Sequence, residues 1–112
     1  MSDKLMVIWI SRDVETALNM GFMYAKNSLI RGWWDEVELV IWGPSAEVTV
    51  ENELIQKELK AMAEAGVKLK ACIACANNYG VADKLSVLGI EVISMGPPLT
   101  EELKKGTKVI TV

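Results

Sequence analysis

Short apolar runs alternate with longer amphipathic segments along the chain. Runs rich in Val, Ile and Leu are bounded by Gly, Pro or charged residues, a pattern that is typical of strands buried in a sheet. Between these runs, apolar residues recur every three or four positions, as they do on one face of a helix. We expect strands over residues 5–10, 37–42, 67–72, 90–94 and 107–112, and helices over residues 13–30, 51–65, 78–88 and 99–105.

The alternation of strand and helix predicts the fold. Connections of this length are too long for hairpins, so the strands are expected to lie parallel and to be joined by right-handed crossovers. We therefore predict a single α/β domain over residues 1–112, a three-layer α/β/α sandwich around a mostly parallel five-stranded sheet. The last strand alternates apolar and polar residues and is expected at an edge. Glu47–Val50 is expected to be a loop or the lead-in to a helix.

The apolar surplus of the chain predicts self-association. Hydrophobic residues make up 51% of the sequence and the mean hydropathy is +0.23. No apolar run approaches the ~18 residues needed to cross a bilayer, so we expect no membrane partner and place the surplus between the subunits of a homo-oligomer. The helix over residues 13–30 carries Met20, Met23, Tyr24 and Ile30 in addition to the residues that would pack on a sheet. This wide apolar arc favours the helix as a subunit interface.

The charge of the chain argues against a nucleic-acid partner, and its N-terminal residues favour a cytoplasmic location. The 12 Lys and Arg residues are mixed with 15 Asp and Glu residues, and the net charge is −3. Such a chain has no basic stripe to neutralise phosphates, so we expect no direct nucleic-acid partner. Residues 1–4 lack the shape of a signal peptide, and we expect a cytoplasmic protein.

Trp33 and Trp34 follow a helix and precede a strand, which predicts that they lie at the amino-terminal end of the sheet, as packing or interface residues.

The only two cysteines, Cys72 and Cys75, stand where the third strand ends and a helix is about to begin. The carboxyl ends of parallel strands are where α/β proteins place their binding sites. Helix amides near a thiol favour the thiolate, so we expect a lowered cysteine pKa. The sequence contains no histidine, which favours chemistry that does without the usual proton shuttle at neutral pH.

Four interpretations of this cysteine pair remain open. Redox exchange of the thioredoxin kind fits the C-x-x-C spacing, although the motif follows the third strand instead of the first. A zinc site would need further ligands from a second subunit, so we expect neither a metal nor a cofactor within one chain. Both cysteines can also be small apolar packing residues. A persulfide carrier needs only a nucleophilic thiolate and no general base.

The segment Gly-Val-Lys-Leu-Lys-Ala-Cys-Ile-Ala-Cys-Ala-Asn-Asn-Tyr-Gly-Val over residues 66–81 resembles the cysteine segment of the DsrE/DsrF-like family. The resemblance covers most of the chain and includes Trp-Gly-Pro at 42–44 and Met-Gly-Pro-Pro-Leu-Thr at 95–100. In the sulfur-carrying members of the family, one cysteine followed by small residues and then Gly-Val holds the sulfur. Cys72 matches that cysteine by its spacing to Gly80 and Val81. Cys75 falls where those carriers usually have a small residue.

The resemblance implies a fold like that of the DsrE/YchN-like proteins and assembly into a homotrimer or homohexamer. It also implies a cytoplasmic sulfur carrier, with sulfur donor and acceptor proteins as partners. Cys72 would hold the persulfide and Cys75 would assist or resolve it, with helix amides after Cys75 stabilising the thiolate. Such a carrier is sulfurtransferase-like, without turnover of its own.

The alternative function is a non-catalytic oligomeric module that binds a small anion or metabolite. Trp9 and Trp42 end two adjacent strands and are expected to wall a pocket beside the cysteines. Arg12 is a cation at the same edge and could stabilise a thiolate or a bound anion. Asn77 and Asn78 follow the cysteines and are further candidates for binding residues.

Overall fold

A computed structural model of the protein describes residues 3–112. Its five strands form one sheet in the order β4-β3-β2-β1-β5, and every neighbouring pair is parallel. The strands are β1 (Lys4–Trp9), β2 (Glu36–Ile41), β3 (Lys68–Cys72), β4 (Glu91–Ile93) and β5 (Lys108–Thr111). The predicted α/β fold is thus confirmed, and β5 lies at an edge as its alternating sequence predicts.

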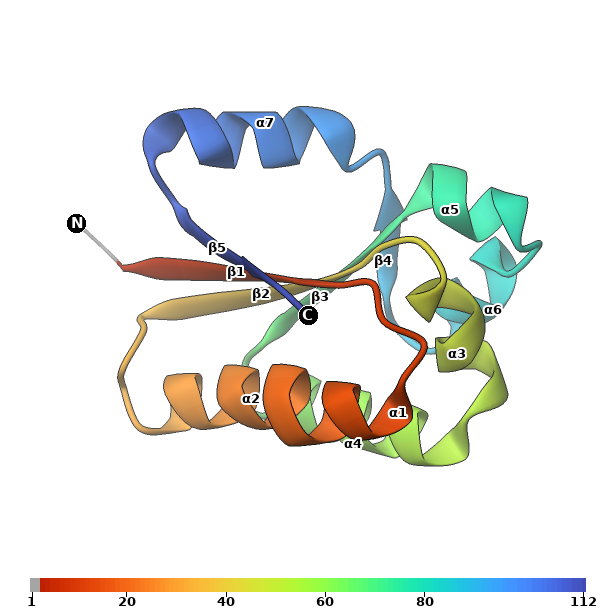
Figure 1. Cartoon of the computed structure of the whole chain (residues 1–112), viewed down its shortest axis with the longest axis horizontal. Helices are drawn as coiled ribbons and strands as arrows, with labels where there is room; N and C mark the ends of the chain where they lie inside the picture. Colours follow the sequence, from red (N-terminus) through yellow and green to blue (C-terminus); the bar gives the residue numbers. More distant parts are fainter. Residues whose placement is uncertain (1–2) are drawn as a thin grey trace.

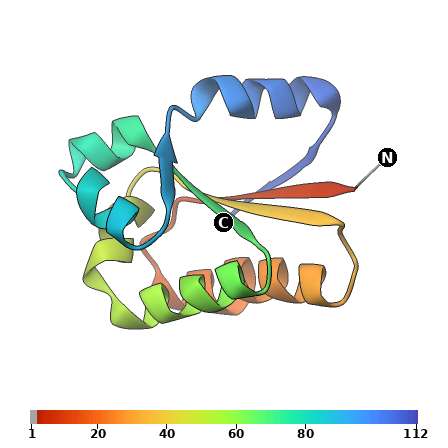
Figure 2. The same ribbon diagram turned by 180° about the vertical axis from the view of Figure 1, so that it is seen from behind.

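Helices cover both faces of the sheet, but unevenly (Figure 1). They are α1 (Val14–Thr16), η1 (Ala17–Phe22), α2 (Met23–Ile30), α3 (Ser45–Glu51), α4 (Glu53–Glu64), α5 (Ile73–Asn78), α6 (Ala82–Val87) and α7 (Gly96–Lys105). The views from the front and from behind both show α2 and α4 below the sheet, α7 alone above it, and α5 and α6 beyond the carboxyl ends of the strands (Figures 1 and 2). Within residues 3–112, no helix combines the length and the apolar character needed to cross a bilayer.

The segment predicted as one helix over residues 13–30 has a wider turn in its middle. Residues Ala17–Phe22 form a π-helix between two α-helical stretches. A Cβ placed on Gly21 would stand 2.8 Å from Cγ2 of Val112. The absence of a side chain at Gly21 therefore lets the C-terminal residue lie against this turn. Spacing alone did not reveal the π-helix, because a stretch of six residues is too short to establish a period of its own between two α-helical stretches.

The segment expected to lead into a helix forms a separate helix, α3. The backbone of Asn52 is extended, with φ −116° and ψ 113°, and separates α3 from α4. The side-chain oxygen of Asn52 accepts a hydrogen bond of 2.9 Å from the amide of Ile55 and caps α4. At the other end of α3, the Ser45 hydroxyl donates to the carbonyl of Trp9 at 2.6 Å, which ties α3 to the carboxyl end of β1.

The alternation of side chains along the strands creates two cores of different size. Leu5, Val7 and Trp9 of β1 point into the larger core, together with residues of α2 and α4 such as Ala25 and Ile55. The opposite face carries a smaller core of four buried residues, Met6, Val40, Cys72 and Met95. The carboxyl half of this second face is thus apolar, and its amino half is charged.

The charged half of that face is centred on Glu38, whose side chain is only 1% exposed. Lys4 Nζ lies 3.0 Å from Glu38 Oε2, and Lys70 Nζ lies 3.3 Å from Oε1. The second contact is purely electrostatic, because Oε1 has no hydrogen-bond partner among the described residues. Glu102 of α7 also meets Lys4, at 3.3 Å. Ion pairs therefore connect α7 to the sheet where apolar packing is missing.

Glu102 gives this region a dependence on pH. The Thr107 hydroxyl donates to it at 2.6 Å, and together with Lys105 and Lys4 it lowers the Glu102 pKa from 4.5 to about 2, although burial acts in the opposite direction. Because the pKa is lowered in the folded state, the stabilisation is present above pH 4.5 and is lost as the pH falls towards 2. We expect Glu102→Gln to lower the free energy of unfolding by about 1–2 kcal/mol at neutral pH.

Urea unfolding of the wild type and of Glu102→Gln at about pH 7, 5 and 3 measures this effect. The difference in free energy of unfolding between the two proteins should shrink as the pH falls from about 5 to about 3. Glu101→Gln is the matched control, because the neighbouring Glu101 is exposed. A difference that stays constant with pH would contradict the role assigned to the Glu102 carboxylate.

Candidate functional site

Cys72 lies at the junction of strand and helix. It is the last residue of β3 and the N-cap residue of α5, with an extended backbone at φ −71° and ψ 118°. The helix therefore begins at Ile73, whereas the sequence predicted a loop up to Asn78 and a helix after it. Cys75 lies inside α5, on its first turn.

A turn at Tyr79 and Gly80 ends α5 where the sequence predicted a helix start. Gly80 has a left-handed backbone with φ +66°, a conformation that glycine adopts without strain. The amide of Gly80 donates to the carbonyl of Asn77 at 3.1 Å, and that of Val81 donates to Ala76 at 2.8 Å. Gly-Val after the cysteine segment thus ends the short helix that carries Cys75, and Val81 then packs in the larger core.

Both thiols are free and lie against the smaller core. Cys72 is buried, with 6% of its surface exposed, whereas Cys75 is half-buried at the rim of the same cluster. Ile8, Trp42, Ile93 and Leu99 are among the apolar residues around them. Of the two thiols, Cys75 is therefore the one that a reaction partner reaches first.

The pKa of the Cys75 thiol is raised, whereas the sequence predicted a lowered cysteine pKa. Burial raises the pKa of the Cys75 thiol, the neighbouring Cys72 thiol raises it further, and the backbone amide of Gly43 acts in the opposite direction. The prediction of a lowered pKa was therefore wrong for this residue. The physical reason is that Cys75 packs against apolar side chains, and this burial disfavours the charged thiolate more than the nearby backbone amides favour it.

The two tryptophans expected to wall one pocket lie on opposite faces of the sheet. Trp9 is fully buried in the larger core, where its ring meets Phe22 edge-to-face at a centroid distance of 4.9 Å. Trp9 is opposite Ile41 in the sheet register, so Trp42 stands one residue further and faces the other side. Trp42 packs against the cysteine cluster as predicted. Trp9 does not, because its side chain points away from that face.

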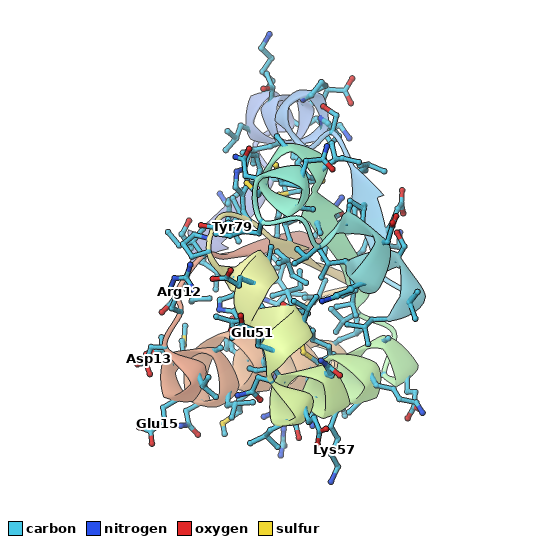
Figure 3. The ribbon with its side chains drawn as sticks, turned by 90° about the vertical axis from the view of Figure 1, so that its right-hand side faces the viewer. Arg12, Asp13, Glu15, Glu51, Lys57 and Tyr79 are labelled. Carbon is cyan, nitrogen blue, oxygen red and sulfur yellow. The ribbon has the colours of Figure 1, made fainter. Side chains whose placement is uncertain are left out.

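Arg12 contacts Glu47 and Tyr79 at the carboxyl edge of the sheet. Its Nη1 lies 2.9 Å from Glu47 Oε1, and its guanidinium carbon lies 5.7 Å from the centre of the Tyr79 ring; Figure 3 shows Arg12 next to Tyr79. Asn77 and Asn78 are exposed on the last turn of α5.

A hollow of about 390 Å³ lies beside Arg12. It is also lined by Val14, Val48, Glu51 and Asn52, and by neither cysteine. The anion pocket expected between Trp9, Trp42 and Arg12 is therefore not assembled.

The sequence predicted no site role for two neighbours of the cysteines, Gly43 and Met95. Gly43 supplies the amide that acts on Cys75, and Met95 is one of the four buried residues of the smaller core. Both belong to loops at the carboxyl edge of the sheet, and the signal for them in the sequence was their place in two of the segments that carry the family resemblance, residues 42–44 and 95–100. Within residues 3–112, no three His, Cys, Asp or Glu side chains converge to hold a metal ion.

Comparison with known proteins gives one family. The family model of the DsrE/DsrF-like family matches residues 6–112. Among solved structures, the conserved protein of unknown function BT1422 from Bacteroides thetaiotaomicron superposes with a TM-score of 0.95 at 40% identity, over 98% of this chain and 95% of that one.

Two more distant structures have the same fold. The ychN protein from E. coli has a TM-score of 0.71 at 19% identity, and the protein of unknown function MTH1491 from Methanobacterium thermoautotrophicum has 0.76 at 17% identity. Both alignments cover the full length of both chains. Among curated proteins, none matches this chain.

Proposed function

Since the chain belongs to the DsrE/DsrF-like family, we propose that it is a sulfur carrier that accepts a sulfur atom as a persulfide on the Cys72–Cys75 pair and hands it to a partner protein. The observation that supports this most is the position of the two thiols. They are free, adjacent and set in an apolar cluster at the carboxyl edge of the sheet. The spacing of Cys72 to Gly80 and Val81 resembles that of the sulfur-carrying members of the family.

The proposed loading step needs no cofactor. A cysteine thiolate attacks the terminal sulfur of a donor persulfide, so that a new S–S bond forms on the cysteine and the S–S bond of the donor breaks. The donor leaves as a thiolate, and the terminal proton stays on the transferred sulfur. Delivery to an acceptor thiolate is the same reaction in the other direction.

Burial assigns different parts to the two thiols in this proposal. Cys75 is the more exposed and takes the sulfur from the donor. Cys72, its buried neighbour, then attacks the terminal sulfur on Cys75 and holds it. A persulfide on Cys72 is shielded from dissolved thiols by the apolar cluster around it, as a carrier requires. Retention on Cys72 and assistance by Cys75 are the roles that the family resemblance implies.

Intact-mass spectrometry after incubation with cysteine and a cysteine desulfurase tests this function. We expect the wild type to gain one sulfur atom that a reductant removes. The double variant Cys72→Ala/Cys75→Ala, which contains no cysteine, is the negative control. Absence of any gain under conditions that load a known carrier would mean that the cysteines are packing residues.

The proposal includes a cytoplasmic homo-oligomer, a trimer or hexamer. Large apolar side chains are exposed on the monomer, among them Met20, Met23 and Ile30 on one side of η1 and α2, and exposed apolar area of this kind marks contact surfaces. We expect light scattering to give a mass three or six times that of the 12.3 kDa chain. A monomeric mass at micromolar concentration would contradict it.

A further inference from the structure

A cleft lies at the amino-terminal end of the sheet, opposite the cysteines. It has a volume of about 640 Å³ and is lined by Asp3, Lys4, Trp33, Trp34, Lys105 and Lys108, among others. These residues come from the starts of β1 and β5, the α2–β2 connection and the end of α7, which meet at the end of the sheet far from α5 (Figures 1 and 2). Small-molecule sites commonly have volumes of roughly 300–1,000 Å³. We call it the amino-edge cleft.

One wall of the amino-edge cleft is aromatic and held in place. The indole N–H of Trp34 donates to the hydroxyl of Tyr24 at 3.2 Å, and the ring of Tyr24 lies 6.2 Å from that of Trp33, measured between centroids. Trp33 is nevertheless 56% exposed. An exposed indole with a supported neighbour can stack on a planar ring without rearrangement, and such stacking strengthens binding.

The other wall is cationic. Lys4 and Lys105 both pair with the Glu102 carboxylate, at 3.3 and 3.2 Å, which fixes their ammonium groups beside the cleft. Lys108 has no carboxylate within ion-pairing distance among residues 3–112. Asp3 is the acidic residue of the lining. Lys4 also pairs with Glu36 and Glu38, at 3.3 and 3.0 Å, and these two carboxylates are shared with Lys68 and Lys70. In this network five lysines stand against the four carboxylates of Asp3, Glu36, Glu38 and Glu102, and Lys108 is the cation of the lining that is left to meet an anion.

We propose that the amino-edge cleft binds a small mononucleotide-like ligand, a planar ring joined to a phosphate group. The ring stacks on Trp33, and the phosphate lies near Lys108 and Lys105. Lysine ammonium groups are common phosphate partners because they donate in several directions from a mobile stem. This site is independent of the sulfur chemistry, since it shares no residue with the cysteine cluster.

Isothermal titration of the full chain with AMP, adenosine and inorganic phosphate tests the proposal. We expect saturable binding of AMP that is at least about tenfold tighter than that of either part alone, because stacking and charge act together. Raising the salt concentration should weaken it, since the lysines are near the surface. Binding of AMP no tighter than that of adenosine or phosphate, or no binding at millimolar AMP, would overturn the proposal.

Exposed side chains allow variants that leave the core intact. Trp33→Ala and Lys108→Ala should each weaken AMP binding, by about tenfold for the tryptophan and about threefold for the lysine. Asp3→Asn should strengthen it, because it removes the negative charge from the lining. Lys104→Ala is the control, an exposed lysine on α7 that does not line the cleft. If Trp33→Ala binds AMP as tightly as Lys104→Ala does, the site is not the amino-edge cleft.

Discussion

Cys72→Ala is expected to abolish stable sulfur loading while leaving the chain folded. The substitution removes one sulfur atom from the smaller core but keeps the backbone of β3 and the start of α5, because alanine tolerates the extended backbone of Cys72. Without Cys72, a sulfur taken up by Cys75 stays at the half-buried rim, where dissolved thiols remove it. Intact-mass spectrometry after desalting into a thiol-containing buffer measures the retained sulfur.

Cys75→Ala separates the two roles. This variant should still retain sulfur on Cys72 but load at least about tenfold more slowly, because the accessible attacking thiol is gone. In the wild type, loading should accelerate as the pH rises above neutral, since burial raises the Cys75 pKa and a higher pH restores the thiolate. Stable retention in Cys72→Ala, or equal loading rates in wild type and Cys75→Ala, would refute the assignment of these roles.

Glu38→Ala is expected to lower the free energy of unfolding by about 3 kcal/mol. Glu38 is the buried centre of the charged half of the sheet face, and its removal leaves Lys4 and Lys70 facing each other without their common anion. Both lysines are about one-fifth exposed, at 21% and 22%, so their ends can turn partly towards water. The cost is therefore at the lower end of the range for breaking a buried pair.

Urea unfolding of three variants measures this effect. Lys70→Met should cost less than Glu38→Ala, because Glu38 keeps its contact with Lys4. Lys68→Met is the exposed control. The Lys68 side chain is 59% exposed and its ammonium pairs with Glu36 at 3.5 Å, so a change below about 1 kcal/mol is expected. If Glu38→Ala were as stable as Lys68→Met, the buried carboxylate would not hold this face together.

The charged half of the sheet face has a consequence for the whole fold. Among residues 3–112, α7 is the helix that lies along this side (Figure 1), with Cys75 of α5 at its carboxyl edge. α7 contacts the sheet through the smaller core at one end and through Glu102 and Lys4 at the other. The large core on the opposite face contains many more apolar residues. Acid conditions that protonate Glu102 should therefore weaken the attachment of α7 before they affect α2 and α4.

The sequence by itself determined the architecture. Continuous apolar runs and three- to four-residue periodicity predicted the strand order along the chain, the parallel pairing and the edge position of β5, and the cysteine segment indicated the family. These features are local or follow from topology, because burial on two faces requires an apolar run and parallel pairing requires a crossover.

The tertiary structure decided the details of the site. The sheet register places Trp9 and Trp42 on opposite faces, and packing against the smaller core buries Cys72 and raises the pKa of Cys75. Glu47, which is distant from Arg12 in the sequence, forms an ion pair with it. No local pattern carries this information, because burial, register and ion pairing depend on residues that are distant in sequence and become neighbours only when the chain folds.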